Sequence, residues 1–129
     1  MKIYITAPFK GEDNKNEIEK MCSIIRESWF EDYCFVRDEK AFDDYHKMMQ
    51  RAKEEVIKCD VLLIDYDGPT HGRMIELGIA YTMDKKIILI TKEGTSIKQT
   101  VRGVVDSIIE YKELEDIIEP MKILLSKWK

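Results

Sequence analysis

The chain has 129 residues, which is enough for one domain, 1–129, that buries a hydrophobic core without a disulfide or a metal ion to stabilise it. Its 21 basic and 25 acidic side chains are interspersed and give a net charge of -4, so the basic stripe of a protein that binds polymeric nucleic acid is missing. No apolar run approaches the ~20 residues that cross a bilayer, and three cysteines without a CxxC pair indicate reduced thiols in a cytoplasmic protein.

The N-terminal part of the sequence predicts a strand followed by a helix. Residues 3–6 are β-branched and aromatic, and Pro8 ends this strand because proline has no N–H to donate to a sheet. Apolar residues then recur at helical spacing as far as Trp29. Asn14 and Glu17 have the spacing of a capping box and mark the start of this helix.

A second strand and a second helix are expected next. The strand is predicted at residues 33–36 and the helix at residues 43–58. Because the rest of that helix is charged, its single apolar stripe should face the core. The stripe consists of Tyr45, Met48, Met49, Ala52 and Val56.

The second half of the chain continues the alternation. Residues 60–65 form a continuous apolar run, which is typical of a strand buried on both faces of a parallel sheet. A glycine-containing turn and a helix at about 72–84 follow it. The remaining predicted elements are a strand at 86–91, a short helix at 96–104, a strand at 107–111 and a terminal amphipathic helix with Pro120 near its first turns.

Five strand–helix units on a short chain predict an α/β fold. The expected architecture is a doubly wound five-stranded parallel sheet with helices on both faces, a flavodoxin-like or Rossmann-like three-layer sandwich. Ligands of such folds bind at the carboxyl ends of the strands, beside the point where the strand order reverses. The turns after the first, third and fourth strands are therefore the places to look for a site.

The stretch DGPTHGRMIELG, residues 67–78, holds a glutamate inside an apolar run. Burying an isolated carboxylate is costly, so Glu76 should be paired, neutralised or kept ionised for use. The nearby helix start favours a negative charge and should keep it anionic. An ionised carboxylate beside a ligand cleft suits attack on, or stabilisation of, a sugar carbon in an oxocarbenium-like transition state. The alternative is a surface glutamate whose neighbours happen to be apolar.

Several stretches carry a resemblance to a known family. The strand DVLLID, the turn after it and ELGIAYTMDKKIILI resemble the nucleoside 2-deoxyribosyltransferase family, whose signature is an ELG tripeptide with a nucleophilic glutamate. IYITAPFKG, GPTHGRMIELG and IKQTVRG narrow the likeness to its deoxynucleoside 5′-monophosphate N-glycosidases. The resemblance implies hydrolysis of the N-glycosidic bond of a nucleoside 5′-monophosphate to a free base and a sugar 5-phosphate. It also implies a homodimer or a larger homo-oligomer.

The resemblance assigns roles residue by residue. Glu76 matches the nucleophile, and Tyr4 matches a tyrosine of the first strand that helps to position the carboxylate or the sugar. No cofactor is needed, because a carboxylate and fixed dipoles can supply the chemistry, and His46 and His71 are too isolated to form a metal site. A phosphate subsite is implied for Lys10, Gly11, Thr70, Gly72 and, from the neighbouring subunit, Lys98.

One position departs from the family. Ala52 stands where the family has an aspartate that orients the sugar and helps with proton transfer. Glu55, His71 or Asp67 could replace it; otherwise the protein is slow, altered in substrate or inactive. A transferase that moves deoxyribose between free nucleosides and a nucleotide-binding protein without turnover are therefore the alternative functions.

Overall fold

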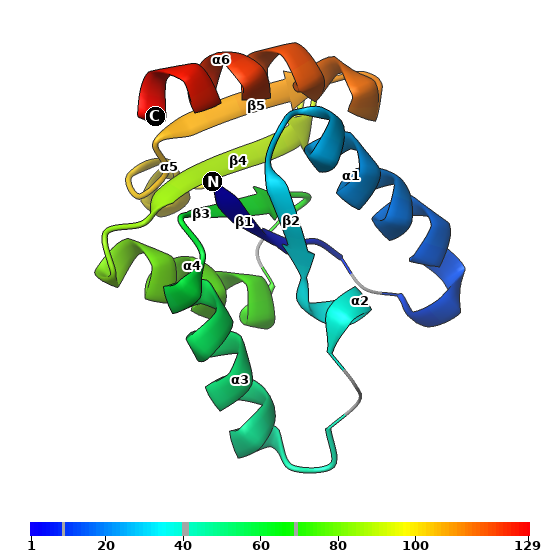
Figure 1. The fold of residues 1–129 in the computed structure, drawn as a ribbon, viewed down its shortest axis with the longest axis vertical. Helices are drawn as coiled ribbons and strands as arrows, with labels where there is room; N and C mark the ends of the chain where they lie inside the picture. The colour runs from blue at the N-terminus through cyan, green and yellow to red at the C-terminus, as the bar shows by residue number, and fades with distance from the viewer. Residues whose placement is uncertain (9, 40–41, 69) are drawn as a thin grey trace.

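In the computed structural model, which describes residues 1–8, 10–39, 42–68 and 70–129, the chain forms a five-stranded parallel sheet covered by helices (Figure 1). The strand order is β2-β1-β3-β4-β5, and every neighbouring pair is parallel. This confirms the predicted doubly wound sheet. The strands are β1 (Lys2–Thr6), β2 (Glu31–Cys34), β3 (Val61–Asp65), β4 (Lys86–Lys92) and β5 (Ser107–Tyr111).

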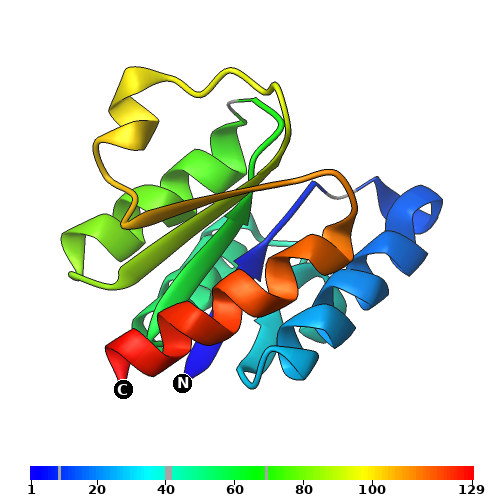
Figure 2. The same cartoon turned by 90° about the horizontal axis from the view of Figure 1, so that it is seen from above.

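Helices cover the two faces of the sheet in two groups. Residues of α1 and α6 pack in a hydrophobic cluster on one face, where Figure 2 shows these helices side by side. Residues of α3, α4 and α5 belong to the cluster on the other face. The helices are α1 (Lys15–Glu27), α2 (Phe35–Asp38), α3 (Tyr45–Lys58), α4 (His71–Thr82), α5 (Gln99–Arg102) and α6 (Ile118–Trp128), with short 3-10 turns η1 (Gly11–Asn14) and η2 (Leu114–Ile117).

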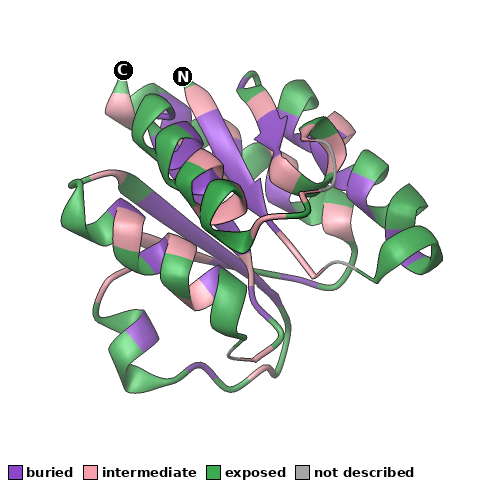
Figure 3. Cartoon of the chain, turned by 90° about the horizontal axis from the view of Figure 1, so that it is seen from below, coloured by how far each residue is buried: buried purple, intermediate pink, exposed green. Residues whose placement is uncertain are grey.

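The two central strands are buried, as their continuous apolar sequences predict. In Figure 3 the middle of the sheet is buried, whereas the helices are buried along their inner stripes. Leu63 of β3 pairs in register with Ile88 of β4, and both side chains are fully buried. The three cysteines are also buried and free, in agreement with a role in packing.

The predicted strand at 33–36 is wrong in its second half. Strand β2 ends at Cys34, and the chain then forms the single turn of α2. The Asp38 carboxylate accepts a hydrogen bond from the Cys34 backbone N–H at 3.0 Å, and Arg37 pairs with Asp38 and with Asp32 of β2. These contacts tie the turn back onto the strand that it leaves.

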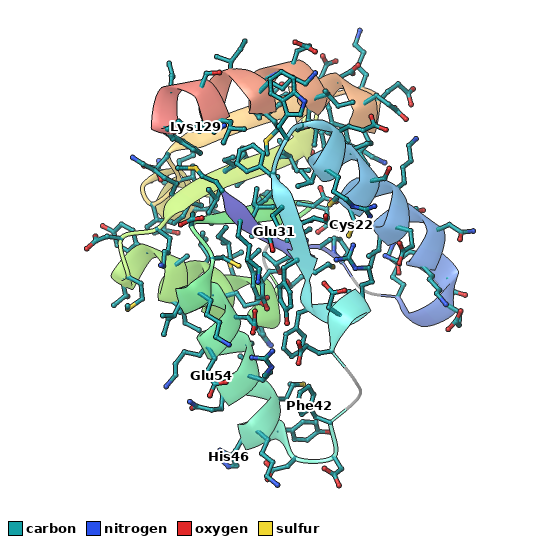
Figure 4. The ribbon with its side chains drawn as sticks, in the orientation of Figure 1. Cys22, Glu31, Phe42, His46, Glu54 and Lys129 are labelled. Atoms are coloured by element: carbon teal, nitrogen blue, oxygen red, sulfur yellow. The ribbon has the colours of Figure 1, made fainter. Side chains whose placement is uncertain are left out.

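Three further local predictions need correction. Asn14 occupies the N-cap position of α1, as predicted, but its side chain makes no capping hydrogen bond; it accepts from the Lys10 N–H at 2.8 Å and donates to the Pro8 carbonyl, which closes the loop after β1. The helix predicted at 96–104 is confined to α5. Tyr45 is 78% exposed because α3 begins beyond the sheet, where Figure 4 also places His46.

Candidate active site

The carboxylate of Glu76 lies between α4 and the end of β1. The Thr6 hydroxyl donates to Oε1 of Glu76 at 2.8 Å, and the Tyr4 hydroxyl donates to Oε2. Tyr4 itself is fully buried in the cluster beneath α4, so its hydroxyl reaches the carboxylate from inside the core. Each carboxylate oxygen therefore has one hydrogen-bond donor, which is how the fold accommodates an acid within an apolar run.

Burial and hydrogen bonding act on Glu76 in opposite directions. Burial raises its pKa, while the donors Tyr4 and Thr6, and the charge of Arg73, lower it. Burial is the larger effect, so the pKa of Glu76 lies above its ordinary value, and the two hydroxyls and Arg73 are the groups that favour the anion. Burial and the nearby carboxylate also raise the pKa of Tyr4, so the phenol keeps its proton and donates.

A cavity of about 410 Å³ opens beside Glu76 at the carboxyl ends of the strands. The site is close to the β1–β3 boundary, where the strand order reverses. The turn of α2 supplies Phe35 and Val36 to its wall, so the corrected end of β2 shapes the site. The other lining residues are Ile5, Thr6, Ala7, Pro8, Lys10, Asp67, Thr70, Gly72 and Arg73.

A larger cavity of about 490 Å³ adjoins the first one on the α1 side of the sheet. Asp65 lines it and accepts a hydrogen bond from the Tyr111 hydroxyl at 3.1 Å. The two cavities share Lys10 and Asp67, but Glu76 lines the smaller one. We therefore place the candidate active site in the smaller cavity, because it contains the Glu76 carboxylate.

The structure brings together part of the predicted phosphate subsite. Lys10, Thr70 and Gly72 line the cavity with Glu76, and Thr70 is the residue that begins α4. Among the described residues, Gly11 and Lys98 do not line this cavity. Gly11 has a positive φ of 65° and starts the η1 turn, and Lys98 is exposed at the start of α5.

Glu55 does not take the place of the missing family aspartate. It is buried, but its carboxylate lies 2.5 Å from Arg51 and 3.9 Å from Lys2, at the start of β1. Lys2 and Thr6 are the first and last residues of β1, about 13 Å apart at ~3.3 Å per residue. Glu55 therefore belongs to an ion-pair cluster at the amino ends of the strands, whereas Glu76 lies at their carboxyl ends.

The other two candidates to replace the family aspartate, His71 and Asp67, differ in position. His71 is exposed and, within the described part of the chain, does not contribute to the cavity wall. Asp67 does line the cavity, and its carboxylate pairs with Arg73 at 2.8 Å. Ala52 is buried on α3 and offers no acid.

Two residues of the site were missed in the sequence. Thr6 gives no signal, because a threonine at the end of a strand is common and its partner is 70 residues away. Arg73 lies within the stretch that drew attention to Glu76, but it was assigned no role from the sequence. It is buried and lines the cavity.

Among the described residues, no group of three or more histidine, cysteine, aspartate or glutamate side chains is placed to hold a metal ion. Within those same residues, no helix has the length and apolar character to pass through a membrane.

A partly buried carboxylate with two hydroxyl donors, at the ligand edge of a doubly wound sheet, defines an α/β enzyme with a small-molecule substrate. Comparison with known proteins agrees with this class. The chain belongs to the nucleoside 2-deoxyribosyltransferase family, whose model matches residues 3–116. A 5-hydroxymethyl-dUMP N-hydrolase of Esox lucius is 35% identical over 100 residues, which cover 70% of this chain and 69% of the relative.

Two solved structures share the fold. A CMP N-glycosidase of Clostridium botulinum has a TM-score of 0.73 at 21% identity and covers 96% of this chain and 99% of its own. A 2-deoxyribosyltransferase of Bacillus psychrosaccharolyticus has a TM-score of 0.74 at 17% identity, with coverages of 92% and 90%. The predicted family and the predicted class, an enzyme that acts on N-glycosyl bonds, are thus confirmed.

Proposed function

We propose that the protein hydrolyses the N-glycosidic bond of a nucleoside 5′-monophosphate, ribo or deoxyribo, and releases the free base and the sugar 5-phosphate. One observation carries the proposal: a single cavity holds the Glu76 carboxylate together with Lys10 and Thr70 at the start of α4. A carboxylate suits the anomeric carbon, and a cation beside a helix start suits a phosphate. The N-hydrolase and N-glycosidase names of two similar proteins, which both refer to nucleotides, support this substrate class.

Glu76 is the proposed nucleophile. One of its oxygens attacks the anomeric carbon while the N-glycosidic bond breaks, and the base leaves with the bonding electrons and takes up a proton. Water then hydrolyses the glycosyl ester, which frees the sugar 5-phosphate and restores the carboxylate. Tyr4 and Thr6 hold the two oxygens of Glu76, so the carboxylate is oriented before the substrate arrives.

The remaining walls suit the two ends of a nucleotide. Lys10 and the first residues of α4 would bind the phosphate, since charge and free N–H groups favour an anion there. Phe35 and Val36 form an apolar wall that suits the flat face of a base. In a homodimer, Lys98 would reach the phosphate from the neighbouring subunit.

Asp67 is the proposed substitute for the family aspartate. Among the described residues that line the cavity, it is the carboxylate besides Glu76. It would exchange a proton with the leaving base or with the attacking water. The variant Ala52→Asp restores the family aspartate and tests whether its absence lowers the turnover rate. A large gain in turnover would mean that the missing acid limits this enzyme.

Base release from a panel of nucleoside 5′-monophosphates, followed by chromatography, tests the activity. Free base and sugar phosphate should appear with the wild type and disappear with Glu76→Gln. Activity that survives in Glu76→Gln would show that the nucleophile is another group. A matched control is Glu54→Gln on the exposed side of α3, which should keep the wild-type rate.

The alternatives predict different products. A transferase would convert a free deoxynucleoside and an acceptor base into a second nucleoside, and it would not need Lys10 or Thr70 at the site. A nucleotide-binding protein without turnover would bind a nucleoside monophosphate saturably in calorimetry and release no base during long incubation.

A further inference from the structure

Arg73 makes three polar contacts across the turn that precedes α4. Its Nε donates to the Thr70 hydroxyl oxygen at 2.9 Å, and its Nη1 donates to the Asp65 carbonyl at 2.6 Å. Its Nη2 lies 2.8 Å from a carboxylate oxygen of Asp67. The side chain is 8% exposed, whereas Asp67 is 58% exposed, so a buried cation holds an exposed loop. Three separate acceptors hold the guanidinium in one orientation, and the guanidinium in turn fixes the positions of these acceptors in the turn.

The hydrogen bond from Arg73 determines what Thr70 can do. An arginine has no acceptor atom, so in this contact the Thr70 oxygen must accept. The hydroxyl proton of Thr70 then points elsewhere, and among the described residues no acceptor takes it, nor does it cap α4. Thr70 is exposed to the cavity that contains Glu76. It therefore presents a donor to any ligand in that cavity, and the group that best takes a hydroxyl proton is an anion.

Arg73 also balances the charge at this end of the cavity. Asp67 lines the cavity beside Thr70 and would repel an anionic ligand. Its pairing with Arg73 offsets that repulsion without removing the carboxylate.

From these contacts we propose that Arg73 is a positioning residue that makes the cavity selective for substrates with a phosphate: it orients the Thr70 hydroxyl as a donor and neutralises Asp67. The inference rests on the proposed function for the identity of the substrate. The predicted binding of a phosphate group does not depend on that function, because it can be measured without turnover. Arg73 acts through Thr70 and Asp67 rather than on the reacting carbon. Its loss should therefore weaken binding of the phosphate, whereas any effect on the chemical step, through Asp67 or Glu76, should be the same with and without a phosphate on the substrate.

Kinetics of Arg73→Met with a nucleoside 5′-monophosphate and with the matching free nucleoside test the proposal. For the nucleotide, KM should rise about 10- to 100-fold, which is the usual effect of losing a charge-assisted contact. For the nucleoside, KM should stay close to that of the wild type, and any change in kcat should be the same for both substrates. An equal rise in KM for both substrates would overturn the proposal, because it would indicate general damage to the fold. Arg26→Met, which removes an arginine paired with Asp32 away from the cavity, is the matched control.

Two double variants separate positioning from plain structural support. Thr70→Val should raise KM for the nucleotide as Arg73→Met does, and the double variant should be no worse than the more damaged single one. Thr70 is exposed, so its variant keeps the test valid even if Arg73→Met folds poorly. Asp67→Asn should restore part of the affinity lost in Arg73→Met, since it removes the charge that Arg73 no longer balances. Additive effects and no rescue would contradict the proposed mechanism.

Binding of ribose 5-phosphate and of ribose, measured by calorimetry, distinguishes this inference from the proposed function. Arg73→Met should lose affinity for ribose 5-phosphate about 10- to 100-fold and show no change for ribose. If the wild type released no base from any nucleotide, but Arg73→Met still bound ribose 5-phosphate more weakly than the wild type, the proposed function would fail and the inference would stand. If Arg73→Met kept the wild-type affinity for ribose 5-phosphate while the wild type cleaved nucleotides, the inference alone would fail.

Discussion

Replacing Tyr4 with phenylalanine removes one hydroxyl from the Glu76 carboxylate and changes little else. The ring of Tyr4 is fully buried and lies 5.4 Å from the ring of Tyr33, measured between centroids, so phenylalanine fills the same space. The lost hydrogen bond has an ionised acceptor and contributes about 1.5–3 kcal/mol. Because the Tyr4 bond opposes the rise in the Glu76 pKa that burial causes, its removal raises that pKa further.

The expected result follows from the proposed role of Glu76 as an anion. Near neutral pH, kcat/KM for a nucleoside 5′-monophosphate should fall about 10- to 100-fold in Tyr4→Phe. Glu76 acts in its deprotonated form, so activity is lost as the pH falls through its pKa, and a higher pKa moves this acid limb to higher pH. Rates of base release measured from acidic to alkaline pH give both quantities.

A matched variant provides the control. The Tyr33 hydroxyl donates to Glu39 at 2.7 Å rather than to Glu76, so Tyr33→Phe removes a buried phenol of the same cluster and should leave the acid limb in place. An acid limb that stays unchanged in Tyr4→Phe, or that moves equally in both variants, would refute the assignment of Tyr4 as the donor that holds the reacting carboxylate.

Four further outcomes are expected. Thr6→Val removes the bond of 2.8 Å to the other oxygen of Glu76, so it should shift the acid limb in the same direction as Tyr4→Phe, in the same assay. Since burial raises the Glu76 pKa, the folded wild type loses stability as the pH rises through that pKa. In thermal unfolding, Glu76→Gln should therefore unfold at a higher temperature than the wild type at alkaline pH, and the difference should shrink at acidic pH. If Lys10 binds a phosphate, KM for the nucleotide should rise with added salt while KM for the free nucleoside stays constant, and equal salt effects would contradict that role. Leu63→Ala, in the fully buried middle of β3, should lower the free energy of unfolding in urea by about 2–5 kcal/mol.

The fold was accessible from the sequence because its main signals are local. The centres of β3 and β4, residues 61–64 and 87–90, are continuously apolar, and the helices carry one apolar stripe each, so period and composition predict a buried parallel sheet with covering helices. Errors occurred where side chains override that pattern. Val36 looks like the end of a strand, but Asp38 and Arg37 close a helical turn around it.

The candidate site was accessible in part. Glu76 stood out because a carboxylate in an apolar run is unusual, and Lys10 and Thr70 followed from the family resemblance. In the structure, all three residues line the same cavity. Glu55 shows the limit of spacing arguments. Glu55 lies one turn along α3 from Ala52, but its carboxylate pairs with Lys2 at the amino ends of the strands, away from the cavity. Helical spacing does not reveal which neighbour a long side chain will contact.

By itself, the sequence determined the order of the elements, the strands that are buried and the presence of one acid that a core would not favour. The tertiary structure decided how that acid is held. Thr6 and Tyr4 are 70 and 72 residues from Glu76, and they meet it because parallel pairing of β1 and β3 aligns their ends beneath α4. Hydrogen bonds between such distant residues depend on the closed geometry of the chain, which no local period encodes.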